Sequence, residues 1–320
     1  MISKHELLNK AKEGFYKPEI LEKVFKLLEV LQSFSELEFL KNRFVLKGGT
    51  ALNLFYFNNL PRLSVDIDLN YIGSLSKEIM LEERPIIQEI ILKILNQQGL
   101  TPTRSPTSYA GGKMVWRYDS ILGYKGNLEI DLNYMYRQPL LDILWQSPNF
   151  KIHPYHDLQI PVLDVHELAA GKLTALFARR ASRDLFDAHY LLTNNLLSLE
   201  KLRPIWVSYL SMSNIPLENI IPDYINYNLQ SVHNELLPVL KQNHQLNKKT
   251  DLDIWLKKTL NELKTALSKF LPLKPSEIQF IKKVNQDAII QPELITLDPT
   301  LITRIAAHPA ILWAAGKKRS

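Results

Sequence analysis

Two aspartates stand two residues apart in the run Val65-Asp66-Ile67-Asp68-Leu69. The alternation of polar and apolar residues predicts a β-strand with Asp66 and Asp68 on one face, about 7 Å apart. Two like charges on one face repel each other, and burial raises that cost. A divalent cation removes the penalty, because Mg²⁺ binds carboxylate oxygens together with substrate phosphates. The alternative is an exposed strand face that carries two solvated acids.

A second alternating run, Leu128-Glu129-Ile130-Asp131-Leu132, also predicts a strand. It places Glu129 and Asp131 on one face. A third carboxylate on a neighbouring strand is what a two-metal site for phosphoryl transfer requires. We therefore expect Asp131 to lie beside the acids of the first run.

Paired glycines, Gly48 and Gly49, precede Thr50 between a predicted strand over residues 44–46 and a predicted helix over residues 51–57. Glycines let backbone N–H groups come close to a phosphate, and the N-terminus of a helix favours an anion. This turn is a candidate phosphate site, and the alternative is an ordinary tight turn.

Charged residues recur at helical spacing in the second half of the chain. Lys172, Arg179 and Arg183 follow one another at intervals of seven and four residues, and Asp184 and Asp187 are three residues apart. Residues three apart can share a helix face, so Asp184 and Asp187 are expected to lie together. The alternative is a simple ion pair between Arg183 and Asp187.

The elements that must position these residues differ between the two halves of the chain. The patterns predict helices over residues 6–33, 51–57 and 77–98, strands over residues 44–46, 65–71, 113–120 and 127–134, and a loop over residues 101–112. Later patterns predict helices over residues 165–180, 183–192 and 251–270, with breaks at Pro204, Pro216, Pro222 and Pro272. We expect an α/β domain over residues 1–160 and an all-helical domain over residues 161–320.

Composition excludes several classes of protein. The 320 residues are 46% hydrophobic and 22% charged, which is typical of globular proteins and excludes a disordered or fibrous chain. The chain has no cysteine, so disulfides, thiolate metal sites and cysteine nucleophiles are excluded. We find neither a signal sequence nor a run of about 20 apolar residues, and we expect a soluble, cytoplasmic protein without a membrane partner.

The net charge of +6 is uneven along the chain. Residues 1–160 hold 19 basic and 18 acidic side chains, and residues 161–320 hold 20 and 15. A basic second half suits a nucleic acid or a nucleotide, although a slightly basic solvated surface has the same composition.

The order of these motifs resembles the AbiEii/AbiGii nucleotidyltransferase toxins, a family of the polymerase-β-like superfamily. The first motif is similar to Leu46–Leu52 followed by Arg62–Leu69. The later Lys…Arg-Asp-x-x-Asp motif is similar to Lys172–Leu176 with Arg179 and Arg183–Asp187, and a segment near the C-terminus of the family is similar to His308–Trp313.

The resemblance implies an α+β fold. A minimal nucleotidyltransferase domain with a mixed sheet flanked by helices would be followed by an all-helical C-terminal domain that contributes Lys172 and Asp184 to the site. It also implies an enzyme that transfers NMP from an NTP and releases pyrophosphate, with Mg²⁺, or Mn²⁺ in its place, as the cofactor.

The resemblance assigns roles to individual residues. Asp66, Asp68 and Asp131 would bind metal, with Asp131 also the candidate general base. Gly48, Gly49, Thr50 and Ser64 would line the triphosphate. Lys172 would contact phosphate, and Asp184 is favoured over Asp187 as the acid that completes the site.

The resemblance also implies partners. The protein would be a toxin of a toxin–antitoxin or antiviral defence system with a cognate antitoxin encoded nearby, and it would modify an RNA, such as the 3′ end of tRNA, to block translation. The candidate RNA contacts are Arg179, Arg180, Lys201, Lys257 and Lys258. Two alternatives are transfer to a small molecule or protein, and an inactive module that binds a nucleotide or an antitoxin.

Overall fold

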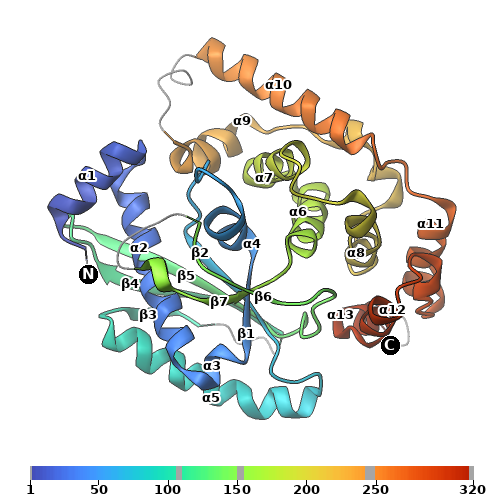
Figure 1. Cartoon of the computed structure of the whole chain (residues 1–320), viewed down its shortest axis with the longest axis horizontal. Coiled ribbons are helices and arrows are strands. Elements are labelled where there is room, and N and C mark those ends of the chain that lie inside the picture. The colour runs from blue at the N-terminus through green and yellow to red at the C-terminus, as the bar shows by residue number, and fades with distance from the viewer. Residues whose placement is uncertain (1, 106–109, 150–154, 242–248, 317–320) are drawn as a thin grey trace. The chain divides into compact units, whose positions relative to one another are not determined.

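The computed structural model describes residues 2–105, 110–149, 155–241 and 249–316 (Figure 1). The chain divides into two compact units. The first comprises Met1–Arg137, Ile143–Leu163 and Pro238–Gln242, and the second comprises Gln138–Asp142, Asp164–Leu237 and Asn243–Ser320. Residues 138–142 therefore belong to the second unit, although the chain before and after them belongs to the first. Residues 238–242 belong to the first unit, although the chain before and after them belongs to the second.

The first unit contains a mixed sheet of seven strands in the order β3-β4-β5-β2-β1-β7-β6 (Figure 1). The neighbours β2/β5 and β1/β7 are parallel, and the other pairs are antiparallel. The strands are β1 Phe44–Lys47, β2 Asp66–Tyr71, β3 Thr101–Arg104, β4 Gly111–Asp119, β5 Lys125–Asn133, β6 Leu144–Gln146 and β7 Ile160–Val162.

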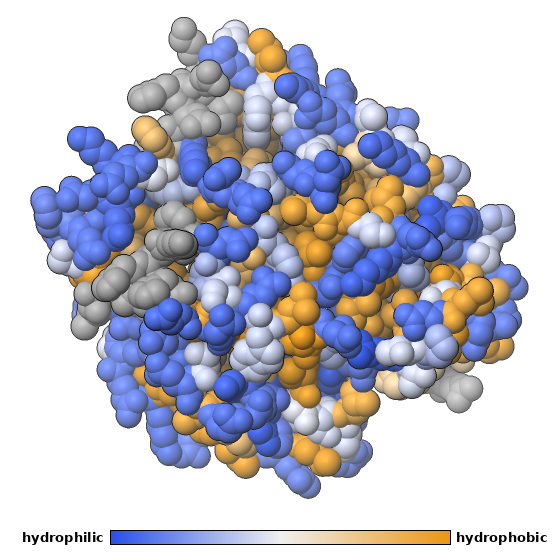
Figure 2. Space-filling view, viewed as in Figure 1, coloured by the Kyte–Doolittle hydropathy of each residue, from blue (hydrophilic) through white to orange (hydrophobic). Residues whose placement is uncertain are grey.

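Five α-helices accompany the sheet in the described part of this unit. They are α1 Lys4–Gly14, α2 Pro18–Glu36, α3 Glu38–Lys41, α4 Gly48–Ala51, which continues as a π-helix over Leu52–Tyr56, and α5 Lys77–Gln97. Ser3 and Ser76 cap α1 and α5 by accepting a backbone hydrogen bond, as N-cap serines do. Helix α1 buries Leu7 and Ala11, and its outward surface is hydrophilic (Figure 2).

The two faces of the β4–β5 hairpin differ sharply. Met114, Trp116 and Tyr118 of β4 are buried, whereas Lys113, Arg117 and Asp119 at alternate positions are exposed. Strand β5 has the same alternation, with Leu128, Ile130 and Leu132 buried. One face of the hairpin therefore forms core with the helices, and the other face carries polar residues toward solvent.

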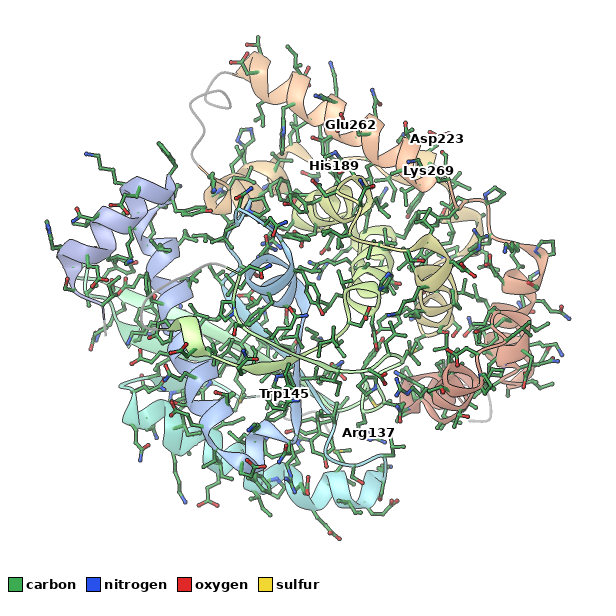
Figure 3. All side chains as sticks on the ribbon, viewed as in Figure 1. Arg137, Trp145, His189, Asp223, Glu262 and Lys269 are labelled. Carbon is green, nitrogen blue, oxygen red and sulfur yellow. The ribbon has the colours of Figure 1, made fainter. Side chains whose placement is uncertain are left out.

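The second unit is helical. Its α-helices are α6 Val165–Arg179, α7 Ser182–Thr193, α8 Leu199–Ser211, α9 Leu229–Ser231, α10 Lys249–Leu267, α11 Pro275–Lys282, α12 Pro299–Ala307 and α13 Pro309–Gly316. Asp164 caps α6, as expected, by accepting from the backbone N–H of His166. His189 of α7 and Glu262 of α10 lie 2.8 Å apart and link the two helices (Figure 3).

The expected α+β class, with a mixed sheet flanked by helices and a helical C-terminal region, is confirmed. Three local expectations are wrong. The predicted helix over residues 6–33 is two helices, because α1 ends where Phe15 takes a left-handed backbone conformation and α2 begins at Pro18. The predicted loop over residues 101–112 contains β3 and the start of β4, with residues 106–109 outside the described residues. Pro204 lies inside α8 and does not break it, because only one backbone hydrogen bond near the start of the helix is lost.

Candidate active site

Four acidic side chains share one face of the sheet on two neighbouring strands. In the parallel pairing of β2 with β5, Asp66 is in register with Glu129, and Asp68 is in register with Asp131. Paired positions on adjacent strands hold their side chains on the same face within contact range. The structure therefore brings Asp131 beside the Asp66/Asp68 pair, as the sequence predicted.

Two lysines extend this arrangement across four strands. Lys47 of β1 is in register with Asp68, and Lys113 of β4 is in register with Asp131. We call the four residues Lys47, Asp68, Asp131 and Lys113 the charged row. Lys113 also forms an ion pair with Glu129. Sequence analysis did not assign a role to either lysine, because their place beside the acids depends on strand register.

The charges of the row act on one another. Burial raises the pKa of Asp131, Asp68 raises it further, and Lys47 and Lys113 oppose the shift. The ion pair with Glu129 raises the pKa of Lys113, and the charges of Asp66 and Asp68 raise it further. The lysines therefore offset part of the repulsion between adjacent carboxylates.

The carboxylates of Asp68 and Asp131 are the groups best suited to bind a cation. Both residues are half-buried, and within the described residues neither has a hydrogen bond or an ion pair. The same part of the chain contains no group of three or more acidic or histidine side chains that could hold a metal ion. A Mg²⁺ ion bound here would therefore complete its shell with substrate phosphates and water, which is its usual mode of binding in NTP-dependent enzymes.

The Gly48-Gly49 turn lies directly against these acids. Gly48 has φ +74°, and a β-carbon at this position would overlap the Asp68 carboxylate. A β-carbon on Gly49 would lie 2.9 Å from Ser64 Oγ and 2.8 Å from the buried Arg62 side chain. Glycine is therefore required for the close approach of this backbone to Asp68 and Ser64.

Thr50 has a structural contact at the same turn. Its side chain is fully buried, and its hydroxyl donates to the carbonyl oxygen of Asp66 at 2.5 Å. This bond fixes the start of β2 relative to the turn. A contact between Thr50 and phosphate remains a prediction.

In the second unit, Lys172 of α6 lies between two buried aspartates of α7. Its Nζ is 2.8 Å from Asp184 Oδ1 and 3.0 Å from Asp187 Oδ2. Arg179 binds the other oxygen of Asp184, with 2.6 Å between Nε and Oδ2. Both aspartates are 0% exposed. The structure thus brings together Lys172, Arg179, Asp184 and Asp187 of the later motif. The Lys172 side chain is held within this cluster and is not exposed on the helix surface.

The electrostatics of Asp184 follow from this pairing. Burial alone would raise the pKa of Asp184, but Lys172 and Arg179 outweigh it and lower the pKa to about 2. Asp184 is therefore ionised at neutral pH. The two cations and two carboxylates balance, as buried charges must.

Glu167 of α6 is a buried acid that sequence analysis missed. Its carboxylate accepts from the backbone N–H groups of Leu140 and Leu141 and from the Tyr209 hydroxyl. Burial outweighs these hydrogen bonds and raises the pKa of Glu167 to about 7. A single Glu in a helix gives no sequence signal of such burial, because the partners are distant in the chain.

Comparison with known proteins decides the family. A family model described as nucleotidyl transferase AbiEii toxin, type IV toxin–antitoxin system, matches residues 29–276. The chain belongs to this family. The expected AbiEii-type nucleotidyltransferase is thereby confirmed. The matched region of this AbiEii protein includes the Gly48 turn, the acids of β2 and β5 and the Lys172 cluster, whereas residues 308–313 lie outside it.

A solved structure shares the fold of this AbiEii protein. It is MenT4, a nucleotidyltransferase toxin from Mycobacterium tuberculosis, with a TM-score of 0.61 and 15% sequence identity over 96% of this chain and 98% of that chain. A comparison with curated protein sequences finds no match. In the part of the chain that the structure describes, no helix combines the length and apolarity needed to cross a membrane.

Proposed function

We propose that this AbiEii-family enzyme transfers NMP from an NTP to a hydroxyl group of an RNA, with the 3′ end of tRNA as the favoured acceptor. The observation that carries the proposal is the unpartnered pair Asp68 and Asp131 in the charged row, next to the Gly48 turn. Half-buried carboxylates without donors suit an enzyme that receives a cation together with its nucleotide.

The proposed roles within the first unit follow from position. Mg²⁺, or Mn²⁺ in its place, would be held by Asp68 and Asp131, and it would supply charge stabilisation at the transferred phosphate. A contact from Asp66, on the same face of β2, stays a prediction from the resemblance. Asp131 accepts the proton of the attacking hydroxyl. Lys47 and Lys113 flank the carboxylates and stabilise the negative charge of the phosphates. Gly48, Gly49 and Ser64 provide the close backbone and hydroxyl contacts of the triphosphate turn.

The proposed role of the second unit rests on its buried cluster. Asp184 and Asp187 both bind Lys172 Nζ and hold it in one place, so that its ammonium group can contact the triphosphate. Asp184 is the stronger candidate for the essential acid, because it binds both Lys172 and Arg179.

The biological part of the proposal follows from the family. A type IV toxin–antitoxin toxin implies a cognate antitoxin, and we propose that RNA modification in the cytoplasm blocks translation and serves phage defence. The alternatives are transfer to a small molecule and transfer to a protein. The experiment described next distinguishes them from transfer to RNA.

The test is incubation of the enzyme with each α-³²P-labelled NTP, purified tRNA and Mg²⁺, followed by a denaturing gel. We expect labelled tRNA with one or few preferred nucleotides, and no labelling after chelation of the metal. Trimming the 3′ terminal nucleotides should abolish or shift the product. Labelling of a protein or small molecule in place of RNA would refute the proposed acceptor.

A further inference from the structure

The polar face of the β3–β4–β5 region continues away from the charged row in register. Beyond Asp131 and Lys113, the next row holds Glu129, Val115 and Arg104, and the row after it holds Asn127, Arg117 and Thr101. We call Thr101, Arg104, Arg117 and Asn127 the hairpin face. Arg117 lies four residues from Lys113 along β4, or about 13 Å at the rise of a strand.

The hairpin face is open to solvent. Its four residues are all exposed, whereas the opposite face of β4 and β5 is core; in β3 all four residues are exposed. A sheet face of this kind needs no covering layer for stability, because its side chains are polar. It is therefore free to bind another molecule.

Two guanidinium groups on this face lack protein partners. Within the described residues, Arg104 and Arg117 have no hydrogen bond, ion pair or ring contact from their side chains. The two lysines of β4 and β5 are compensated, Lys113 by Glu129 and Lys125 by Asp119. The net positive charge of the face thus comes from its two unpaired arginines, and guanidinium groups bind phosphates in a bidentate manner.

The basic residues that sequence analysis proposed as RNA contacts are engaged elsewhere. Arg179 binds Asp184, and Arg180 lies over the Tyr224 ring. The lysines of that set bind acids: Lys201 binds Asp164, Lys257 binds Asp253, and Lys258 binds Glu262. A phosphate would have to compete with these partners, whereas at Arg104 and Arg117 it would not.

A pocket of about 390 Å³ adjoins the far end of the hairpin face. Asn127 belongs to both, and the other lining residues include Tyr124, Lys23 and Lys125 together with the acid Glu19. Tyr124 is 39% exposed, and its hydroxyl donates to Glu22 of α2, so this side chain points toward the helix. We therefore take the pocket as the end of the hairpin face and not as part of it.

We propose that the hairpin face binds the phosphodiester backbone of the RNA acceptor and leads its reacting end to Asp131. The inference rests on the proposed function and identifies the docking surface of its acceptor. A polymer is favoured over an NTP, because the face extends about 13 Å along the strands beyond the charged row. Single-stranded RNA can follow such a surface with its phosphates on the two arginines.

The test compares wild-type enzyme with the double variant Arg104→Glu/Arg117→Glu. The matched control is Lys12→Glu/Lys93→Glu, which makes the same charge change at exposed lysines of α1 and α5 in the same unit. The probes are fluorescently labelled tRNA and a single-stranded RNA of about 12 nucleotides. Binding is measured by anisotropy from about 50 to about 200 mM salt, and the KM values for RNA and NTP are measured separately.

We expect the arginine variant to bind both RNAs at least about tenfold more weakly than the control, with a salt slope lower by about two. Its KM for NTP should match that of the control. The variant Arg104→Gln/Arg117→Gln should lose RNA affinity to a smaller degree. Equal melting temperatures of the wild type, the control and both arginine variants would exclude misfolding as the cause.

Equal RNA binding and labelling by the arginine variant and the control would overturn this inference while leaving the proposed function intact. Wild-type enzyme that transfers nucleotide to a small molecule or protein, and neither binds nor labels RNA, would overturn both. The two failures are therefore distinguishable.

Discussion

Asp68 of β2 and Asp131 of β5 stand opposite each other on parallel strands, and within the described residues neither carboxylate has a partner. Like charges at paired strand positions destabilise a sheet. Lys47 and Lys113 at the ends of the row reduce this cost. A row built in this way keeps two acids together and accessible, which a purely structural sheet does not need.

Replacement of Asp68 by Asn should separate stability from activity. Asp68→Asn removes one of two facing charges, so the melting temperature without metal should stay equal or rise slightly. Nucleotide transfer should fall by orders of magnitude, because a cation would lose a ligand. The control is Asp119→Asn, an exposed acid of β4. Wild-type turnover by Asp68→Asn would remove the carboxylate row from the mechanism.

Gly48 should tolerate no side chain. Gly48→Ala combines the strain of φ +74° with an overlap on Asp68, and we expect at least a tenfold loss of kcat/KM. Gly123→Ala is a matched control, because Gly123 has φ +95° with open space around it. Both variants should lose about 1 kcal/mol or more of stability from backbone strain. Equal activity of the two variants would show that the Gly48 turn does not position Asp68 for catalysis.

Lys172 should prove essential for folding as well as for any chemistry. Lys172→Ala leaves Asp184 and Asp187 buried without their shared cation, a change that costs about 3–5 kcal/mol. The triple variant Lys172→Met/Asp184→Asn/Asp187→Asn should regain most of that stability by removing the two buried carboxylate charges. Thermal unfolding tests this directly. If the triple variant melts normally and still transfers nucleotide, the cluster is structural only.

Glu167 should give the helical unit a pH-dependent stability. Its pKa is raised from 4.5 to about 7 in the folded state, so the folded protein binds an extra proton between these values. The contribution to the free energy of unfolding therefore decreases as pH rises from about 4.5 to 7, by about 3 kcal/mol, and is constant above pH 7. Glu167→Gln should remove this slope. Parallel pH curves for wild type and Glu167→Gln would refute the assignment.

The sequence predicted what depends on local pattern. Alternation identified β2 and β5 and put Asp66, Asp68 and Asp131 on strand faces, and helical spacing put Asp184 and Asp187 on one helix face. The family resemblance supplied the expected acid and lysine roles, and the family itself is confirmed.

The sequence could not show what depends on pairing between distant segments. Lys47 and Lys113 join the row only through the register of β1 and β4 with their neighbours. All four residues of edge strand β3 are exposed, and one of them is Pro102, so the composition of this strand is typical of a loop. Glu167 is buried by backbone groups of residues 140–141, to which no local pattern connects it.

The most direct test of the central claim is single-turnover transfer of labelled NMP to purified tRNA by wild type, Asp131→Asn and Asp119→Asn, with and without Mg²⁺. We expect metal-dependent labelling of the RNA 3′ end by wild type and Asp119→Asn. In Asp131→Asn we expect a loss of at least about a thousandfold, with its fold intact. Undiminished labelling by Asp131→Asn, or labelling that persists without a divalent cation, would contradict it.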